Sequence, residues 1–101
     1  MRLYKITTLN IDLPNQKVAV LGAGSWGTAI VSIITENNNV SWWVRRKNQK
    51  KTIIQEQKNK AYLPDLNLNT SRINIYSSLE KIITDSDILI IAIPSEYLEL
   101  N

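Results

Sequence analysis

The sequence has 101 residues, enough for one small domain. Apolar residues make up 44% of it and charged residues 21%, the balance of an ordinary globular chain, and a formal net charge of +3 does not by itself indicate a nucleic-acid partner. Because the chain has neither cysteine nor histidine, disulfides, thiolate chemistry and the commonest metal ligand are excluded, and we expect no metal site.

Targeting and membrane segments are not indicated. The first residues, Met1 to Ile6, lack the apolar core of a signal peptide. The longest aliphatic run, Ile88 to Ile93, is too short to span a bilayer and suits a buried strand instead. We therefore expect a cytoplasmic protein with no membrane span.

The N-terminal third begins with an ambiguous segment. Residues 1–16 mix two hydrophobic periodicities and end near a Pro-Asn turn, so we expect an N-terminal extension that packs loosely or forms an edge. Lys17 to Leu21 is an apolar, β-rich run that predicts a strand buried on both faces. A helix follows from Ser25 to about Asn37, with apolar residues at helical spacing at Trp26, Ala29, Ile30, Ile33 and Ile34.

The middle third predicts a second strand, a polar helix, a loop and a third strand. Val40 to Val44 is β-branched and aromatic and is the second strand. Residues 47–58 suit a polar helix with Ile53 and Ile54 as its buried stripe. Residues 61–72 contain proline and several asparagines and predict a loop, and Ile73 to Tyr76 alternates as a strand does.

The last third predicts a short helix and a fourth strand. Ser77 or Ser78 can cap a helix through Ile83, and residues 85–87 form a turn. Ile88 to Ile93 is the next buried strand, and residues 96–100 begin a helical segment. Strands that alternate with helices predict a Rossmann-type doubly wound parallel α/β sheet, incomplete at its C-terminal end.

The glycine loop between the first strand and helix carries the clearest functional signal. Gly22, Gly24 and Gly27 form Gly-x-Gly-x-x-Gly and are the only glycines of the chain. The first allows a tight turn, the second lets a pyrophosphate approach the backbone, and the third lets the helix pack closely. Free amides and the positive end of the helix favour phosphate, and Ser25 adds a hydroxyl. The alternative is that the three glycines form a tight strand-to-helix turn that binds no ligand.

The end of the second strand bears on the choice of cofactor. Such loops are followed, about twenty residues on, by an acidic residue that binds the ribose of NAD. Here Arg45 and Arg46 stand at that place, and no Asp or Glu occurs between Glu36 and Glu56. Arginine can pair with the 2′-phosphate of NADP, so we expect NADP or NAD as cofactor, with NADPH favoured. Alternatively, both arginines face solvent, or Arg45 stacks on adenine without a strong preference between the two cofactors.

The two arginines open a basic segment that has other interpretations. Seven of the twelve basic residues lie between Arg45 and Lys60. A charge run of this kind is most often a solvated helix face, and it can also meet an anionic ligand. Nucleic-acid binding is disfavoured because the segment lacks interleaved aromatic residues.

Four segments of the chain match, in register, the characteristic segments of one known family. Residues 22–29, Gly-Ala-Gly-Ser-Trp-Gly-Thr-Ala, are similar to the signature loop of that family. The other three matches are residues 43–46 (Trp-Val-Arg-Arg), 59–64 (Asn-Lys-Ala-Tyr-Leu-Pro) and 92–95 (Ala-Ile-Pro-Ser). From Lys17 to the end, the chain therefore resembles the NAD(P)-dependent glycerol-3-phosphate dehydrogenases of the bacterial type. The resemblance adds Trp26 to the cofactor contacts. For Tyr62 and Leu63, packing of their loop onto the sheet and contact with a ligand both stay open.

The resemblance implies an oxidoreductase that reduces dihydroxyacetone phosphate to sn-glycerol 3-phosphate, a reaction that feeds phospholipid synthesis. It implies that residues 17–101 are a partial dinucleotide-binding domain and residues 1–16 an extension. The catalytic lysines of the family lie further along the chain than Asn101, so we expect no catalytic residue here and an absent C-terminal catalytic domain. The implied partners are the dinucleotide and, only with that missing domain, a small phosphorylated substrate. Alternatives are a non-catalytic dinucleotide-binding fragment and a related reductase of the 6-phosphogluconate or ketopantoate type.

Overall fold

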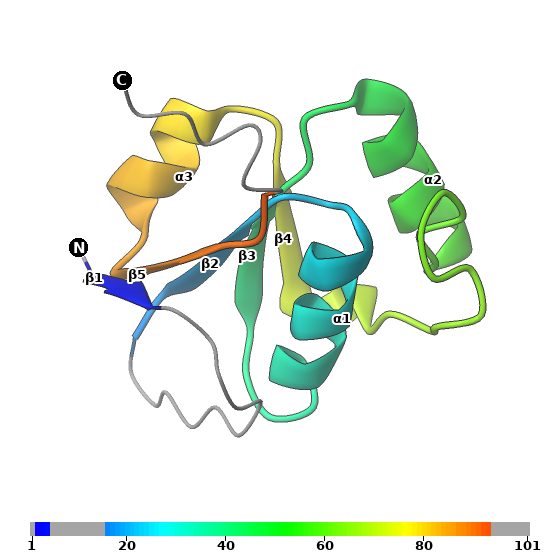
Figure 1. The fold of residues 1–101 in the computed structure, drawn as a ribbon, viewed down its shortest axis with the longest axis horizontal. Coiled ribbons are helices and arrows are strands. Elements are labelled where there is room, and N and C mark those ends of the chain that lie inside the picture. Colours follow the sequence, from blue (N-terminus) through cyan, green and yellow to red (C-terminus); the bar gives the residue numbers. More distant parts are fainter. Residues whose placement is uncertain (1, 5–15, 94–101) are drawn as a thin grey trace.

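Five parallel strands form one sheet in the computed structural model, which describes residues 2–4 and 16–93 (Figure 1). The order across the sheet is β1-β5-β2-β3-β4, and every neighbouring pair runs parallel. The strands are β1 (Arg2–Tyr4), β2 (Val18–Leu21), β3 (Val40–Trp43), β4 (Ile73–Tyr76) and β5 (Ile88–Ile91). The helices are α1 (Ser25–Ile34), α2 (Lys47–Glu56) and α3 (Leu79–Asp85), and a short 3₁₀ turn, η1, covers Thr70–Arg72.

Helices cover both faces of the sheet, as expected for a doubly wound fold. α1 and α2 cover one face and α3 covers the other (Figure 1). Side chains alternate along each strand, so that in β2 Val18 and Val20 join the core under α1 and α2, whereas Ala19 and Leu21 join the core under α3. All four residues of β2 are buried, which confirms the predicted doubly buried strand. β2 lies between β5 and β3, where the order of strands reverses.

Several helix and strand ends differ from those expected, among them the end of α2 at Glu56 rather than residue 58 and the end of β3 at Trp43 rather than Val44. α1 ends at Ile34, three residues before Asn37, and the Thr35 hydroxyl donates to the Val31 carbonyl over 2.9 Å. α3 continues to Asp85 instead of ending at Ile83, and Ser78 caps it by accepting a hydrogen bond from the amide of Lys81. β5 ends at Ile91 rather than Ile93. The expected helical start at residues 96–100 lies outside the described residues.

Several apolar side chains predicted to be buried are exposed. Trp26, counted in the apolar stripe of the first helix, is 67% exposed, because it stands in the first turn beyond the edge of the sheet. Ile53 is fully buried but Ile54 is 53% exposed, since adjacent positions on a short surface helix do not share one face. Ile91 is 41% exposed, so β5 is not buried along its whole length. The two helices and the strand are present as predicted, but the predicted burial of these three side chains was wrong.

The loop after α2 packs against the core through Leu66 and Leu68, and not through Tyr62 or Leu63. Leu68 is 2% exposed and belongs to the core under α1 and α2, with Leu66 packed against it. The Leu68 amide donates to the carbonyl of Gln57 over 2.9 Å, which ties the loop to the end of α2. Tyr62 and Leu63 are 42% and 39% exposed, so they do not anchor the loop.

The edge of β5 is paired by the N-terminal segment. Arg2, Leu3 and Tyr4 pair in parallel with Ile88, Leu89 and Ile90. Of the two arrangements left open for residues 1–16, the structure shows an edge strand for residues 2–4. The last predicted strand therefore has a neighbour on each side, β1 and β2.

We expect deletion of residues 1–4 to lower the thermal unfolding midpoint and to cause self-association. The deletion uncovers the amides and carbonyls of β5, and an open strand edge is a template for pairing with another chain. Sedimentation velocity at several concentrations, with circular dichroism for the midpoint, measures both effects. An unchanged midpoint and a monomer at every concentration would show that β1 adds nothing to the sheet.

In the described part of the chain, no helix is long and apolar enough to cross a membrane.

Candidate functional site

The carboxyl ends of β2, β3 and β5 meet at one edge of the sheet. Leu21 stands opposite Trp43 on β3 and Ile91 on β5. The contact continues past the strands, since the Gly22 amide donates to the Trp43 carbonyl over 3.4 Å and the Ala92 amide donates to the Leu21 carbonyl over 2.8 Å. In open α/β sheets, ligands bind beyond the carboxyl ends of the strands, where the strand order reverses. The glycine loop lies at that point. Pro94 and Ser95, expected at the same edge, lie outside the described residues.

The three glycines of the loop have different surroundings. Gly22 has a φ of +118°, and a Cβ there would lie 2.5 Å from the carbonyl oxygen of Ala92. A Cβ on Gly27 would overlap the carbonyl group of Gly22, so this glycine is what lets α1 start against the end of β2. A Cβ on Gly24 would meet no atom within 4 Å. Gly22 and Gly27 are therefore required by the fold, whereas nothing in the fold requires Gly24.

Each carbonyl of residues 22–24 accepts a hydrogen bond from within the protein. The Trp42 indole donates to the Gly22 oxygen over 2.8 Å. The Ala23 oxygen accepts from Gln49 Nε2 at 2.7 Å and from Asn59 Nδ2 at 3.0 Å. The Gly24 oxygen accepts from the amide and the hydroxyl of Thr28, at 3.0 and 2.7 Å. The loop therefore turns its oxygens inward onto fixed donors.

The amides of the same loop have no such partners in the described part of the chain. Within residues 16–93, no hydrogen-bond acceptor is found for the amides of residues 23–27. Gly24 is the N-cap of α1, no side chain caps the helix, and its first turn holds no acidic residue. Unpaired amides and an uncapped helix start together give a positive field outside the loop, which suits an anion such as phosphate.

The remaining predicted site residues lie on the two chain segments that leave this edge. Ser25 and Trp26 form the first turn of α1, and both are exposed. Arg45 and Arg46 follow β3, both exposed, and Arg46 is the N-cap of α2. The structure thus places the glycine loop and the two arginines beyond the carboxyl ends of neighbouring strands, as predicted.

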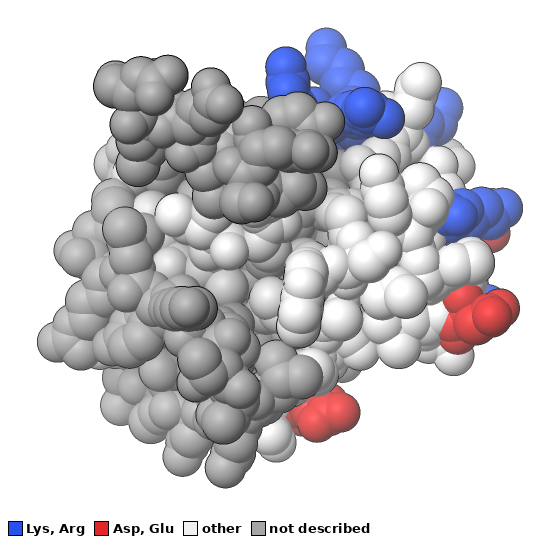
Figure 2. All heavy atoms as spheres, in the orientation of Figure 1, with Lys and Arg blue, Asp and Glu red and all other residues white. Residues whose placement is uncertain are grey.

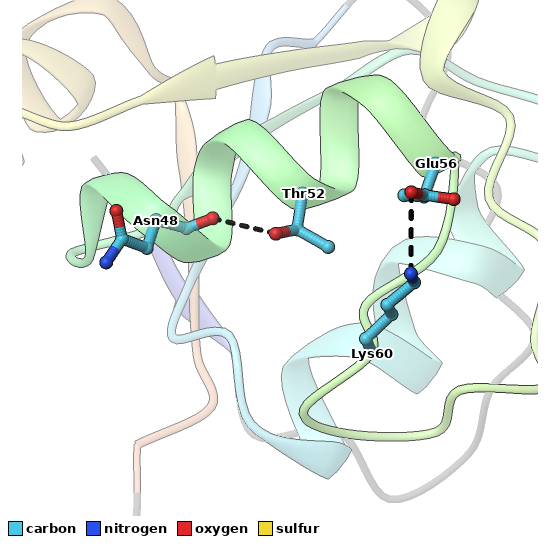
Figure 3. A network of polar contacts seen from close by, with 4 residues as sticks. All are labelled: Asn48, Thr52, Glu56 and Lys60. Atoms are coloured by element: carbon cyan, nitrogen blue, oxygen red, sulfur yellow. Dashed lines mark hydrogen bonds and ion pairs between the residues drawn. The ribbon is translucent and has the colours of Figure 1, made fainter.

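Basic side chains gather over the α2 end of the molecule (Figure 2). Lys60 pairs with Glu56 at 3.4 Å, while Thr52 donates to the Asn48 carbonyl on the same helix (Figure 3). Lys50 Nζ donates to the Ser77 hydroxyl over 3.4 Å. In the described ranges, Lys60–Glu56 is the one ion pair found, so the charges at the start of α2 are not neutralised by a carboxylate there. α2 also begins without a side-chain cap or an acidic residue in its first turn.

Two residues of the site were not assigned a role from the sequence. Asn59 is 1% exposed, and it connects the glycine loop, Thr28 and Gln49. In the sequence, Asn59 is notable only as part of residues 59–64, which resemble a segment of the family. Gln49 has no feature that distinguishes it from other polar residues of a helix. Asn59 stands between two lysines, a sequence context that does not by itself indicate that its side chain is buried.

Tyr76 has the one clear pKa shift among the described titratable groups, and it lies away from the glycine loop. Its hydroxyl donates to Asp85 Oδ2 over 3.0 Å, and this hydrogen bond, with partial burial and the nearby carboxylate charge, raises the pKa of Tyr76 above 10.0. Below pH 10 the phenol is protonated in both states. Above pH 10 the unfolded chain ionises first, so stability falls as pH rises through the folded pKa.

We therefore expect Tyr76→Phe to flatten the loss of stability above pH 10. Urea unfolding of the wild type and the variant between pH 8 and 11 measures the difference, and the subtraction cancels the lysines and other tyrosines. A difference that stays constant with pH would contradict the role of the Tyr76–Asp85 hydrogen bond.

A cavity of about 760 Å³ lies at the opposite end of the sheet. Residues at the amino ends of β2, β3 and β4 line it, among them Lys17, Asn39, Arg72 and Asn74. It shares no residue with the glycine loop. Within the described residues, no three acidic side chains are grouped to hold a metal ion. The glycine loop edge is therefore the better candidate site.

The parallel strand order with a glycine turn at the reversal point defines a Rossmann-type doubly wound domain. The family model "NAD-dependent glycerol-3-phosphate dehydrogenase N-terminus" matches residues 17–101, and the chain belongs to this family. A glycerol-3-phosphate dehydrogenase [NAD(P)+] of Bacillus subtilis is 39% identical over 82 residues, which are 80% of this chain and 24% of that protein. One from Thermoanaerobacter sp. is 41% identical over 80 residues, 78% of this chain and 24% of that protein.

Two solved structures have a similar fold. Glycerol-3-phosphate dehydrogenase of Coxiella burnetii matches with a TM-score of 0.63 at 30% identity, over 74% of this chain and 23% of that one. DsGPDH of Dunaliella salina matches with a TM-score of 0.73 at 22% identity, over 82% of this chain and 19% of that one, and supports the fold. The chain thus spans about a quarter of the length of the curated relatives it matches.

Proposed function

We propose that the glycine loop binds the pyrophosphate of a nicotinamide dinucleotide. The observation that carries the proposal is the orientation of the loop: its carbonyls are bonded inward, and its amides have no acceptor among the residues that the structure describes. Gly24 has open space where a Cβ would stand, which leaves room for a phosphate against the backbone. Ser25 and Trp26, exposed in the first turn of α1, would contact the cofactor beside the phosphates.

We propose that Arg45 and Arg46 hold the adenosine end and favour NADPH. Arg45, Arg46 and Lys47 stand at the start of α2, where the helix dipole is also positive. Such an arrangement is unfavourable unless an anion binds there, and the 2′-phosphate of NADP is an anion that a guanidinium fork matches. An acidic residue, which would repel that phosphate, is missing from the sequence between Glu36 and Glu56.

The reaction proposed for the whole protein is the one that its relatives' names indicate, the oxidation of glycerol 3-phosphate by NAD(P)+ or the reverse reduction. The bound dinucleotide would supply the hydride that reduces dihydroxyacetone phosphate to sn-glycerol 3-phosphate. The residues of this chain would bind and orient the dinucleotide. None of them is proposed to be catalytic, and the phosphorylated substrate is proposed to need residues beyond position 101.

Titration of the 101-residue chain with NADPH and with NADH tests the binding proposal. Trp26 is exposed beside the loop, so its fluorescence should change on binding. We expect saturable binding of both nucleotides, tighter for NADPH, and no oxidation of NADPH when dihydroxyacetone phosphate is added. Absence of binding would refute the site, equal affinities would refute the NADPH preference, and clear turnover would refute the placement of catalysis outside this chain.

A further inference from the structure

We infer that Asn59 and Gln49 are positioning residues that set the glycine loop for dinucleotide binding and tie it to α2. This inference rests on the proposed function of the loop. The donors of both side chains are used inside the protein: Asn59 donates to Ala23 and Thr28, and Gln49 donates to Ala23 and Asn59. Their effect on binding would therefore pass through the backbone of residues 22–24.

The amide group of Asn59 is fully used inside the protein. Its Nδ2 donates to the Ala23 carbonyl at 3.0 Å and to the Thr28 hydroxyl at 2.9 Å, and its Oδ1 accepts from Gln49 Nε2 at 3.2 Å. The Thr28 hydroxyl in turn donates a hydrogen bond to the Gly24 carbonyl over 2.7 Å. One buried side chain thus fixes two successive carbonyls of the loop, one directly and one through Thr28.

The orientation of a peptide plane decides where its amide points. If the Ala23 carbonyl is held inward, the amide of Gly24 in the same plane points outward, and the next plane is set in the same way by the Gly24 carbonyl. Without those donors, the carbonyls would lose buried partners and could turn toward the ligand side. An oxygen facing the pyrophosphate repels it, whereas an amide binds it.

Gln49 adds a connection between the two ends of the proposed cofactor site. It lies on α2, whose N-cap is Arg46, and its Nε2 bonds the Ala23 carbonyl at 2.7 Å. The helix that presents the arginines is therefore attached to the loop that would hold the phosphates. The distance between the two sub-sites is set in part by this one side chain.

Asn59→Asp and Gln49→Leu test the inference in the full 101-residue chain. Both keep approximate size, and each removes one of the two donors to Ala23. Gln49→Leu adds no charge, so it separates the loss of a donor from repulsion of the phosphates by the new carboxylate of Asn59→Asp. Thr35→Val is the matched control, because it removes a buried hydroxyl that bonds the Val31 carbonyl in α1, far from the loop. All proteins are titrated with NADPH and NADH at a temperature where circular dichroism shows each of them folded, so that a loss of stability does not alter the affinity.

We expect both loop variants to bind NADPH and NADH at least about tenfold more weakly, since the pyrophosphate is common to both. The ratio of the two affinities should be unchanged in Asn59→Asp, whereas Gln49→Leu, which also detaches α2 and its arginines from the loop, should lose more affinity for NADPH than for NADH. Thr35→Val should bind both as the wild type does. Wild-type affinities in the loop variants, or an equal loss in Thr35→Val, would overturn the inference. If Asn59→Asp does not fold, Gln49→Leu alone decides. If the wild type binds neither nucleotide, the proposed function fails and this inference fails with it.

Discussion

Gly27→Ala is expected to destabilise the chain strongly, whereas Gly24→Ala is expected to leave stability almost unchanged. A Cβ on Gly27 would overlap the Gly22 carbonyl, so α1 would have to move away from the end of β2. Overpacking of this kind costs on the order of 3 kcal/mol, which for a chain of this size lowers the melting temperature by more than about 10 °C. At Gly24 the same methyl group meets open space and an ordinary extended backbone, φ −84° and ψ −161°.

Although Gly24→Ala is expected to leave stability almost unchanged, it is expected to weaken dinucleotide binding. The methyl group of Gly24→Ala would stand where a phosphate is proposed to approach, so we expect at least about a tenfold loss of affinity for both NADPH and NADH. Thermal unfolding and fluorescence titration of the same two proteins provide the comparison. A Gly24→Ala variant that binds as the wild type does would show that no ligand group approaches the backbone at this position.

Replacement of Arg45 and Arg46 by serine is expected to weaken NADPH binding selectively. Each charge-assisted hydrogen bond to the 2′-phosphate is worth about 1.5–3 kcal/mol, so the double variant, which removes one from each arginine, should lose at least about 100-fold in NADPH affinity. NADH has no 2′-phosphate, and its affinity should change little. Calorimetric titration of both nucleotides against the variant gives the two constants directly.

A control variant separates this local effect from the general loss of positive charge. Lys51 and Lys58 belong to the same basic segment but lie away from the start of α2, so Lys51→Ser with Lys58→Ser removes the same charge. We expect that variant to bind NADPH nearly as the wild type does in 0.15 M salt, where distant charges are screened. Equal losses in the two double variants would mean that only the overall field attracts the nucleotide.

The fold and the loop were predictable from the sequence because both depend on local patterns. Apolar runs such as residues 18–21 and 88–91 identify buried parallel strands, and the glycine spacing identifies the turn between strand and helix. The position of Arg45 and Arg46 followed from the same reasoning, since a residue after a parallel strand must lie at its carboxyl edge. The family resemblance rested on these same segments.

Features that depend on tertiary contacts were not predictable. The pairing of β1 with β5 joins residues more than 80 positions apart, and three residues of mixed pattern do not indicate such a partner. The burial of Asn59 depends on a loop that folds back under the glycine turn. Trp26 and Ile54 fit a helical stripe by spacing, yet the ends and edges of short helices project past the sheet.

The central claim is that the amides of residues 23–27 form the anion-binding surface of the dinucleotide site. A ¹⁵N-resolved NMR titration of the 101-residue chain with NADH tests it most directly, because each backbone amide is observed separately. We predict the largest shifts at Ala23, Gly24, Ser25, Trp26 and Gly27, with small changes around the cavity at Lys17, Asn39 and Arg72. Shifts concentrated at that cavity, with the loop amides unmoved at saturation, would contradict the claim.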